Sequence, residues 1–274
     1  MKLSRAKSLL ESAAYVAKKR GFLAVPPSAG ISIADTLSDL VPPLGRARAR
    51  AVIARLKQAD TDSDLDASIR RAYTFKSFGV EFKPVQLWSE ITALLHAVAE
   101  LKPSAVMEIG RGGGGTLFLF AAASDPRATL LSVDLEAPHD WKAPIYQSFA
   151  QPRQRIELLE ADSHDPITRN RVLDLLQGRR LDFLFIDGDH SYAGVKKDFE
   201  MYAPLVKRGG MVAFHDIVHH PTYPRCEVEK FWNEVKQGHR HAELVEDWHR
   251  AGLGSGFCIF SRFAAQSTDS PSFA

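Results

Sequence analysis

Residues 105–123 read AVMEIGRGGGGTLFLFAAA, and this stretch decides the fold class. It begins with five residues typical of a short buried strand, passes through a cluster of glycines, and ends in an apolar helical segment. Glycine permits a tight turn and lets a ligand approach the backbone. The N-terminus of the following helix offers free N–H groups. The stretch therefore predicts a strand–loop–helix unit with a ligand site at its turn.

Strand and helix patterns alternate along residues 84–263. Helical spacing of apolar residues marks segments before and between the strands, within 87–101, 117–123, 166–178 and 191–206. The expected strands are Ala105–Ile109, Thr129–Val133, Arg155–Leu159, Asp182–Ile186, Met211–Phe214 and Gly256–Ser261. This alternation is the signature of an open α/β sheet with right-handed crossovers. We expect a Rossmann-like, doubly wound, mostly parallel sheet.

The two ends of the chain differ from this central region. Residues 1–83 mix short helical patterns with loops that contain Pro and Gly, which predicts an N-terminal helical cap. Within this cap, residues 1–24 have an amphipathic helical pattern. Residues 264–274 form a polar tail that we expect to be disordered.

Composition excludes several classes of protein. The apolar runs are far shorter than the ~20 residues of a membrane-spanning helix, and the first thirty residues lack the pattern of a secretory signal. The two cysteines cannot form a disulfide framework, so we expect a cytoplasmic protein. Residues 1–100 hold 15 Lys and Arg against 10 Asp and Glu. Because aromatic residues do not interleave these charges, we expect a solvated face and no nucleic-acid partner.

Two classes of ligand suit the glycine loop. Gly110, Gly112 and Gly115 satisfy the GxGxxG fingerprint of dinucleotide-binding proteins, and Asp134 can hold a ribose in either class. Glu108, two residues before Gly110, distinguishes the classes. Its negative charge disfavours a dinucleotide phosphate and favours a cationic ligand with an amino group.

Acidic residues also mark the ends of later strands. Asp162 and Ser163 follow the third strand, and Asp187 ends the fourth. The Asp162 carboxylate can accept from an adenine amino group; the alternative is that it caps the helix that begins at Pro166. Acids at four consecutive strand ends suit S-adenosylmethionine, which carries a sulfonium, an ammonium, a ribose and an adenine but no phosphate.

The order of these motifs resembles the class I S-adenosylmethionine-dependent methyltransferases. The motifs are EIGRGGG at 108–114, VDLE at 133–136, EADS at 160–163 and FIDGDHSYAGVKKDFEMYAPLVKRGGMVAFHD at 185–216. The last one is similar to the branch of metal-dependent small-molecule O-methyltransferases, which includes macrolide-sugar and cephalosporin-modifying enzymes. The resemblance covers residues 85–217.

The resemblance implies a site for S-adenosylmethionine. The glycine loop would meet the methionine part, the acid after the second strand would take the ribose hydroxyls, and the pair after the third strand would bracket the adenine. The implied cofactor-binding residues are Glu108, Gly110, Gly112, Gly114, Asp134, Asp162 and Ser163.

Ionisable side chains also cluster at the ends of the fourth and fifth strands. Asp187 and Asp216 converge because neighbouring parallel strands lie about 4.8 Å apart. The resemblance implies a divalent metal, magnesium or manganese, held by Asp187, His215 and Asp216. Related enzymes usually carry Glu-Asp or Asp-Asn at the last two positions, and imidazole is a poor magnesium ligand. Either the metal differs, or His215 is not a ligand, or the site holds no metal.

His190 is the candidate general base beside Asp187, and these two residues are the expected catalytic pair. The sugar-methylating relatives have a His at this spacing, and the unperturbed pKa of histidine, near 6.5, suits proton transfer. The alternative is that His190 caps the next helix or orients Asp187. We expect an enzyme that methylates a hydroxyl of a sugar or other small natural product. The other candidate functions are an NAD-binding oxidoreductase and a non-catalytic S-adenosylmethionine-binding protein; a homo-oligomer is compatible with each.

Overall fold

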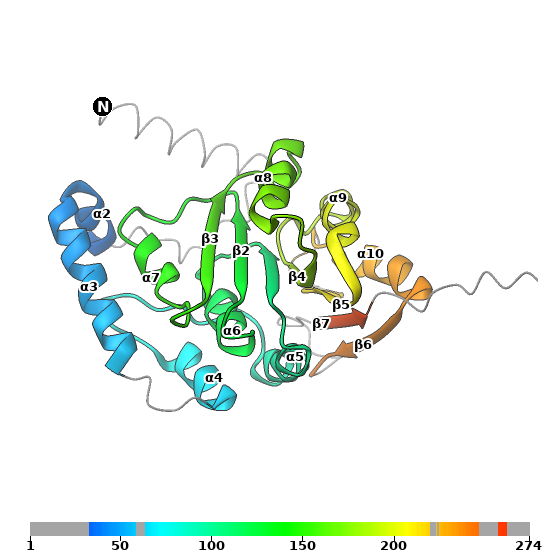
Figure 1. Ribbon diagram of the computed structural model, residues 1–274, viewed down its shortest axis with the longest axis horizontal. Helices are drawn as coiled ribbons and strands as arrows, with labels where there is room; N and C mark the ends of the chain where they lie inside the picture. The colour runs from blue at the N-terminus through cyan, green and yellow to red at the C-terminus, as the bar shows by residue number, and fades with distance from the viewer. Residues whose placement is uncertain (1–32, 59–63, 220–222, 224, 247–256, 262–274) are drawn as a thin grey trace, which may run out of the picture.

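A central sheet organises the chain. The computed structural model describes residues 33–58, 64–219, 223, 225–246 and 257–261, and these residues build a seven-stranded sheet of order β3-β2-β1-β4-β5-β7-β6 (Figure 1). The strands are β1 (Ala105–Ile109), β2 (Thr129–Asp134), β3 (Arg155–Glu160), β4 (Leu181–Ile186), β5 (Val206–Phe214), β6 (Arg240–Leu244) and β7 (Phe257–Ser261). Strands β1 to β5 pair in parallel, and β7 lies antiparallel to β5 and β6. The predicted Rossmann-like, mostly parallel fold is confirmed.

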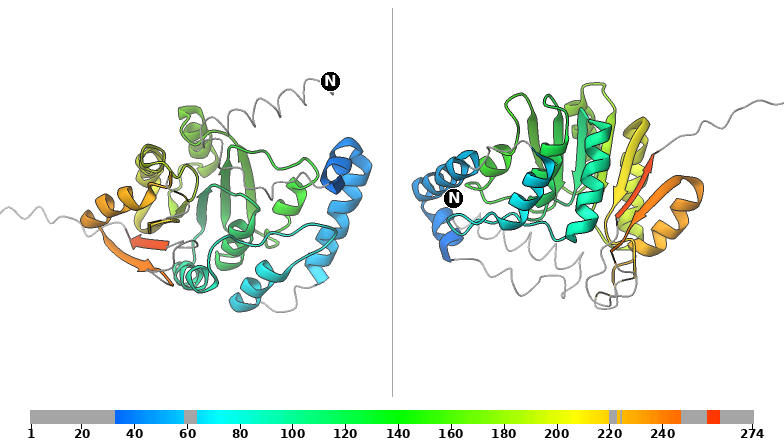
Figure 2. Two further views of the ribbon diagram at one scale, coloured as in Figure 1. Left: turned by 180° about the vertical axis from the view of Figure 1, so that it is seen from behind. Right: turned by 90° about the horizontal axis from the view of Figure 1, so that it is seen from below.

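Helices connect and cover the strands. They are α2 (Ile33–Leu40), α3 (Pro42–Gln58), α4 (Leu65–Thr74), α5 (Trp88–Leu101), α6 (Gly115–Ala123), α7 (Ala143–Gln147), α8 (Pro166–Leu176), α9 (Tyr192–Tyr202) and α10 (Val228–Val235). Short 3-10 turns follow α9 (Ala203–Leu205) and α10 (Lys236–Gly238). Helices α2 and α3 lie beyond the β3 edge of the sheet, and α10 lies at the opposite end with β6 and β7 (Figures 1 and 2).

Two apolar clusters form the core, one on each face of the sheet. Alternate residues of a strand point to opposite faces, so Phe183 of β4 joins the cluster with α3 to α7, whereas Leu184 joins the cluster with α8 to α10. All six residues of β4 are buried. A nearly continuous apolar strand is typical of a parallel sheet that is covered on both faces.

The described part of the predicted cap is helical and packs on this core. Val52 of α3 and Ile69 of α4 belong to the same apolar cluster as α5 and α6. The helical pattern at 1–24 and the tail at 264–274 lie outside the described residues. Among the described helices, none combines the length and the apolar character that crossing a bilayer requires.

Two features of the sheet differ from the sequence-based expectation. Strand β5 begins at Val206, five residues before the expected start, and its pairing with β4 contains a register shift. Gly209, with a φ of 77°, accommodates the irregular backbone there. The sequence does not predict strand β6, because three of its five residues, Arg240, His241 and Glu243, are polar. Pairing with β7 at the edge of the sheet, rather than burial, defines this strand.

Candidate functional site

The loop between β1 and α6 turns on glycines with positive φ: 92° at Gly110, 49° at Gly112 and 84° at Gly114. A Cβ on Gly110 would lie only 2.0 Å from the carbonyl oxygen of Asp187. The Gly110 N–H donates to the Val133 carbonyl at 2.9 Å, and the Asp187 N–H donates to the Ile109 carbonyl at 2.8 Å. Gly110 therefore allows the ends of β1 and β4 to meet closely.

Asp134 holds the glycine loop in place from the end of β2. One of its carboxylate oxygens accepts from the N–H groups of Arg111 and Gly112, at 2.8 and 3.0 Å. The other accepts from the Glu136 N–H at 2.8 Å. A carboxylate offers about four acceptor positions, so Asp134 retains capacity for a ligand hydroxyl.

A pocket opens where β1 to β4 end at their carboxyl termini. Its lining residues are Ile109, Gly110, Val133, Asp134, Leu135, Ala161, Asp162, Ser163, His164, Gly188 and Asp189. This is the edge at which open α/β sheets bind ligands. The structure thus brings together Gly110, Asp134, Asp162 and Ser163, four of the expected cofactor-binding residues.

The other expected cofactor-binding residues lie outside the pocket lining. Gly112 and Gly114 shape the loop, and a Cβ on Gly114 would approach the Tyr146 ring to 2.7 Å. Glu108 is 1% exposed within β1 and accepts hydrogen bonds from Ser132 Oγ at 2.6 Å and Thr116 Oγ1 at 2.9 Å. Burial raises the pKa of Glu108 to about 7, because these two hydroxyls and the nearby Arg111 only partly compensate it.

The loop after β3 is fixed by a histidine that the sequence did not single out. His164 Nε2 lies 3.2 Å from a carboxylate oxygen of the buried Asp198 and 3.1 Å from the Gly194 carbonyl, both on α9. The backbone N–H of His164 donates to Asp162 Oδ1 at 2.9 Å. Helix α8 is capped by Asp165, whose side chain accepts from the Ile167 N–H. The alternative that Asp162 caps this helix is therefore wrong.

Four ionisable side chains meet beside the pocket, at the ends of β4 and β5. His215 Nδ1 lies 3.2 Å from Asp187 Oδ1 and 3.4 Å from Asp216 Oδ1. His190 Nε2 lies 3.1 Å from Asp187 Oδ1 and 3.6 Å from Asp216 Oδ2. The structure thus brings together both expected catalytic residues and all three expected metal ligands. We call these four residues the acid–imidazole cluster.

Opposite charges dominate the electrostatics of the acid–imidazole cluster. Burial favours the neutral form of Asp187, but the charges and hydrogen bonds of His215 and His190 outweigh it and hold its pKa below the usual range. The pKa of Asp216 is lowered in the same way, against burial, chiefly by His215. Burial opposes charging of the imidazoles too, yet the two carboxylates raise the pKa of His190 and raise that of His215 well above its usual value.

The donor atoms of Asp187, His215 and Asp216 fit one divalent metal ion. They all lie within 4.8 Å of one another. The 3.2 and 3.4 Å separations around His215 are close to the roughly 3.0–3.4 Å between neighbouring donors on an ion with bonds of about 2.1 Å. One imidazole with two carboxylates suits manganese, iron or zinc better than magnesium.

Gln86, which no local pattern in the sequence marks, joins the acid–imidazole cluster to the N-terminal cap. Its Nε2 donates to Asp187 Oδ2 at 3.1 Å, and the side chain is buried. The hydroxyl of Tyr73, on α4, donates to the Gln86 carbonyl. The buried Oε1 of Gln86 has no hydrogen-bond partner within the described part of the chain. Only the tertiary fold brings this glutamine to Asp187, 101 residues away in sequence.

Helix α9 is capped by Ser191, whose hydroxyl accepts from the Gly194 N–H at 3.1 Å. The alternative that His190 caps this helix is therefore wrong. The 3.1 Å contact between His190 Nε2 and Asp187 Oδ1 is compatible with two roles of His190. It can transfer a proton, or it can orient the Asp187 carboxylate.

Comparison with known proteins finds similarities in the central part of the chain. Residues 107–217 match the family model described as a methyltransferase domain. The uncharacterized protein R132 of Acanthamoeba polyphaga mimivirus is 47% identical over 69 residues, 24% of this chain. This chain spans 31% of the length of that curated relative.

Solved structures of methyltransferases are also similar. The O-methyltransferase TomG from Streptomyces achromogenes, in complex with SAM, is 15% identical, with a TM-score of 0.48 over 80% of this chain and 99% of its own. The MycE methyltransferase from the mycinamycin biosynthetic pathway, in complex with Mg and SAH, is 18% identical, with a TM-score of 0.48 over 77% of this chain and 57% of its own. The family match over residues 107–217 agrees with the methyltransferase resemblance seen in the sequence.

Proposed function

We propose that this protein transfers a methyl group from S-adenosylmethionine to a hydroxyl of a small-molecule acceptor, such as a sugar or another natural product. The observation that carries the proposal is the contact between the pocket and the acid–imidazole cluster. Gly188 and Asp189 line the pocket, and Asp187 immediately precedes them. A donor in the pocket and an acceptor at the cluster would therefore meet at the end of β4.

The pocket is the donor half of the proposed site, and it has the groups that S-adenosylmethionine, a cation, requires. Asp134 has remaining acceptor capacity for the ribose hydroxyls, and Asp162 and Ser163, which line the pocket, would flank the adenine. Gly110 lets the methionine part approach the backbone of the loop. Beneath the loop, the Glu108 carboxylate favours a ligand with positive charge. S-adenosylmethionine, when bound, supplies an electrophilic methyl group on its sulfonium.

On the acceptor side, His190 is the proton acceptor. The raised pKa of His190 makes it a stronger base than a free imidazole, and it acts from its neutral form. Asp187 fixes the imidazole through Nε2 and stabilises the imidazolium that proton transfer creates. A divalent ion held by Asp187, His215 and Asp216 would supply Lewis acidity that lowers the pKa of an acceptor hydroxyl. Holding donor and acceptor in line in one site lowers the entropic part of the barrier.

Binding of the donor product tests the first half of the proposal. Metal-stripped protein is titrated calorimetrically with S-adenosylhomocysteine and, separately, with NAD. We expect the first ligand to bind and NAD not to bind. Binding of NAD, or of neither, would overturn the proposal and return the glycine loop to a purely conformational role.

Transfer of the methyl group tests the second half. Protein with added manganese or magnesium is incubated with methyl-labelled S-adenosylmethionine and a panel of hydroxylic acceptors. We expect label on an acceptor oxygen with the wild type and none with Asp187→Ala, which still binds S-adenosylhomocysteine. If Asp187→Ala transfers label at the wild-type rate, the acid–imidazole cluster is not the acceptor site. If it loses donor binding as well, the two halves are one structural unit.

A further inference from the structure

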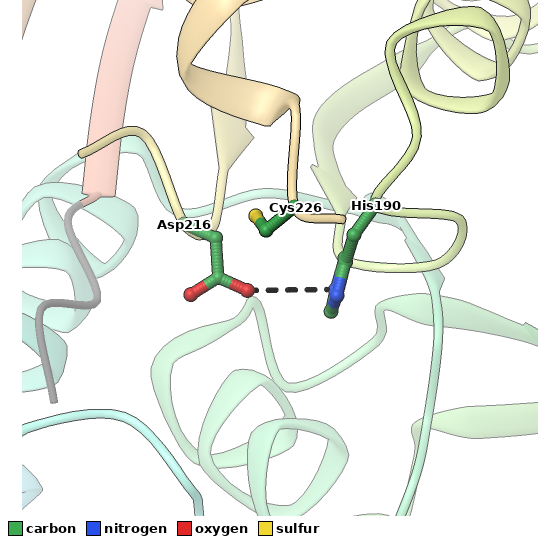
Figure 3. Close-up of side chains that lie close together, drawn as sticks. All are labelled: His190, Asp216 and Cys226. Carbon is green, nitrogen blue, oxygen red and sulfur yellow. Dashed lines mark ion pairs between the residues drawn. The ribbon is translucent and has the colours of Figure 1, made fainter. Parts of the chain in front are cut away.

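A second set of metal-ligating side chains overlaps the acid–imidazole cluster. Ligating atoms of His190, Asp216 and Cys226 all lie within 4.8 Å of one another. Figure 3 shows the Cys226 side chain between the other two, above the 3.6 Å contact of His190 Nε2 with Asp216 Oδ2. We call these residues the thiol triad. It shares only Asp216 with the oxygen-rich set of Asp187, His215 and Asp216.

The backbone holds the thiol triad together. Cys226 lies in the segment that enters α10, and its N–H donates to the Tyr223 carbonyl at 2.9 Å. The next residue, Glu227, donates its N–H to the His190 carbonyl at 2.7 Å, and its side chain accepts from the Tyr192 N–H at 3.2 Å. The segment that carries the thiol is thereby fastened to the loop that carries the imidazole. The three donors come from three separate parts of the chain, so their proximity is a property of the fold.

The donor chemistry selects a thiophilic cation. A thiolate, an imidazole and a carboxylate are all ligands of Zn²⁺, whereas Mg²⁺ and Ca²⁺ take oxygen ligands. The 3.6 Å between His190 Nε2 and Asp216 Oδ2 is near the roughly 3.4 Å expected for two tetrahedral zinc ligands. Three protein donors also leave the fourth tetrahedral position to water.

The proposed reaction gives Cys226 no role of its own. Burial raises the pKa of its thiol to about 12, and the negative charges of Asp216 and Asp187 add to this effect. The thiol is therefore protonated and a poor nucleophile at neutral pH. A bound metal ion reverses this preference, because a coordinating thiol is deprotonated.

We propose that His190, Asp216 and Cys226 bind a thiophilic divalent cation of the zinc class, and that this cation inhibits methyl transfer, because coordination at Nε2 leaves the proton of the neutral imidazole on Nδ1, the nitrogen that would accept the acceptor's proton. As the ion binds, the Cys226 thiol and any imidazolium form of His190 release their protons to solvent, and a sulfur–metal bond forms. His190 binds as the neutral imidazole and Asp216 as the carboxylate. The inhibitory effect rests on the proposed base role of His190, whereas the binding of the cation does not.

Cobalt binding tests the site without any measurement of activity. Full-length protein is titrated with Co²⁺, which replaces zinc and gives a near-ultraviolet sulfur-to-cobalt charge-transfer band when a thiolate is a ligand. We expect the band in the wild type, its loss on adding Zn²⁺, and its absence in Cys226→Ser. The matched control is Cys258→Ser, in β7, which should keep the band. A wild type without the band, or a Cys226→Ser variant that retains it, would overturn the proposal.

Zinc inhibition tests the consequence for the reaction. With manganese or magnesium present, we expect Zn²⁺ to inhibit methyl transfer by the wild type. Cys226→Ser should need at least about 10-fold more zinc, because even loss of a group that only supports a ligand costs 10- to 100-fold in metal affinity. Equal inhibition of both proteins would overturn the inhibitory role.

If Cys226→Ser does not fold, Cys226→Ala replaces it, and zinc competition against a chelating dye on the wild type measures the same affinity. If no acceptor is methylated, the proposed function fails, while the cobalt band still decides the metal site.

Discussion

Two acids near the ends of neighbouring strands, Glu108 and Asp187, have pKa values that are shifted in opposite directions. Glu108 on β1 is 1% exposed and lies beneath the glycine loop, whereas Asp187 follows β4 as a member of the acid–imidazole cluster, with its side chain 12% exposed. The pKa of Glu108 is raised to about 7, whereas that of Asp187 is lowered. Glu108 accepts from two neutral hydroxyls, but His190 and His215 offer Asp187 positive charge. The charge of the partners, rather than burial itself, sets the direction of the shift.

This difference separates the two halves of the proposed site. The donor half leaves a carboxyl without a full counter-charge, so a cationic ligand is the partner that would complete it. The acceptor half is already balanced by its own imidazoles, so a metal ion entering it must displace protons from them. The first half therefore favours a ligand of positive charge, and the second favours proton exchange.

The largest expected effect comes from removing the charge of Asp187. Asp187→Asn should lower kcat/KM for methyl transfer by roughly 10²- to 10⁴-fold, the range for loss of positioned acid–base catalysis. S-adenosylhomocysteine binding should change by less than about tenfold, because the donor half keeps its own charges. Steady-state kinetics and calorimetry on the same preparation measure both quantities. Equal losses in the two assays would show that the halves are not separable.

The pH dependence of methyl transfer should report the charge state of His190. His190 must be neutral to act as a base, and the carboxylates raise its pKa above the ordinary value near 6.5. Activity of the wild type should therefore rise with pH through a midpoint above that value. Asp187→Asn removes one of the charges that raise the pKa, so the midpoint of its residual activity should move to lower pH. An unchanged midpoint would exclude His190 as the titrating base.

Gly110 joins the two halves, and its substitution should damage both. Gly110→Ala adds a Cβ 2.0 Å from the Asp187 carbonyl oxygen at a φ of 92°. Backbone strain and overpacking together should cost about 3–5 kcal/mol in the free energy of unfolding. Gly112→Ala is the matched control, because its φ is also positive but its Cβ would meet nothing within 4 Å. It should cost about 1–2 kcal/mol. Urea denaturation compares them; equal costs would mean that the β1–β4 contact is not tight.

Glu108 should reduce stability at neutral pH. Between pH 4.5, the ordinary pKa, and about 7 the folded chain keeps a proton on Glu108 that the unfolded chain loses. Stability contributed by this group therefore falls as pH rises through that window. Glu108→Gln should remove the fall and stabilise the ligand-free protein at pH 8 by up to about 3 kcal/mol.

The ligand-bound state gives the opposite result for the same variant. S-adenosylmethionine carries a sulfonium charge that S-adenosylhomocysteine lacks, so Glu108→Gln should weaken binding of the first more than binding of the second. Denaturation curves at pH 5 and 8, together with both binding constants, measure these effects. Equal stability of variant and wild type at both pH values would contradict the raised pKa.

The sequence predicts most of the central sheet because local patterns define it. The sequence predicts strand β1 with the bounds that it has, since a short run of apolar residues, interrupted only by Glu108, precedes a glycine cluster. The acid–imidazole cluster was expected for a related reason, because parallel strands bring their carboxyl ends to one edge. Edge strand β6, by contrast, has a polar sequence and depends on pairing with β7.

Residues that only the tertiary fold brings to the site were missed. His164 and Gln86 belong to no motif, and each acts through a partner far away in sequence, Asp198 for the first and Asp187 for the second. Glu108 was expected to face the ligand, but the strand pleat places it among hydroxyls beneath the loop. Alternation along a strand fixes which face a side chain takes, but not how deeply the loop above covers it.

Substitution of Gln86 should have the smallest effect on catalysis, because Gln86 contacts the Asp187 carboxylate but carries no charge. Gln86→Leu removes the Nε2 donor, 3.1 Å from Asp187 Oδ2, and should lower kcat/KM about tenfold, the worth of one hydrogen bond to a charged group. Loss of this donor leaves the Asp187 carboxylate with more effect on the His190 pKa. The pH midpoint of activity should therefore rise, opposite to the shift expected for Asp187→Asn.

Tyr73→Phe is the control, since it removes the hydrogen bond to the Gln86 carbonyl but keeps the Gln86 side-chain amide. If Gln86→Leu lowers stability but leaves the pH midpoint unchanged, Gln86 only packs the cap against the sheet. If the midpoint rises while stability holds, Gln86 tunes the pKa of the proposed base through its side-chain amide.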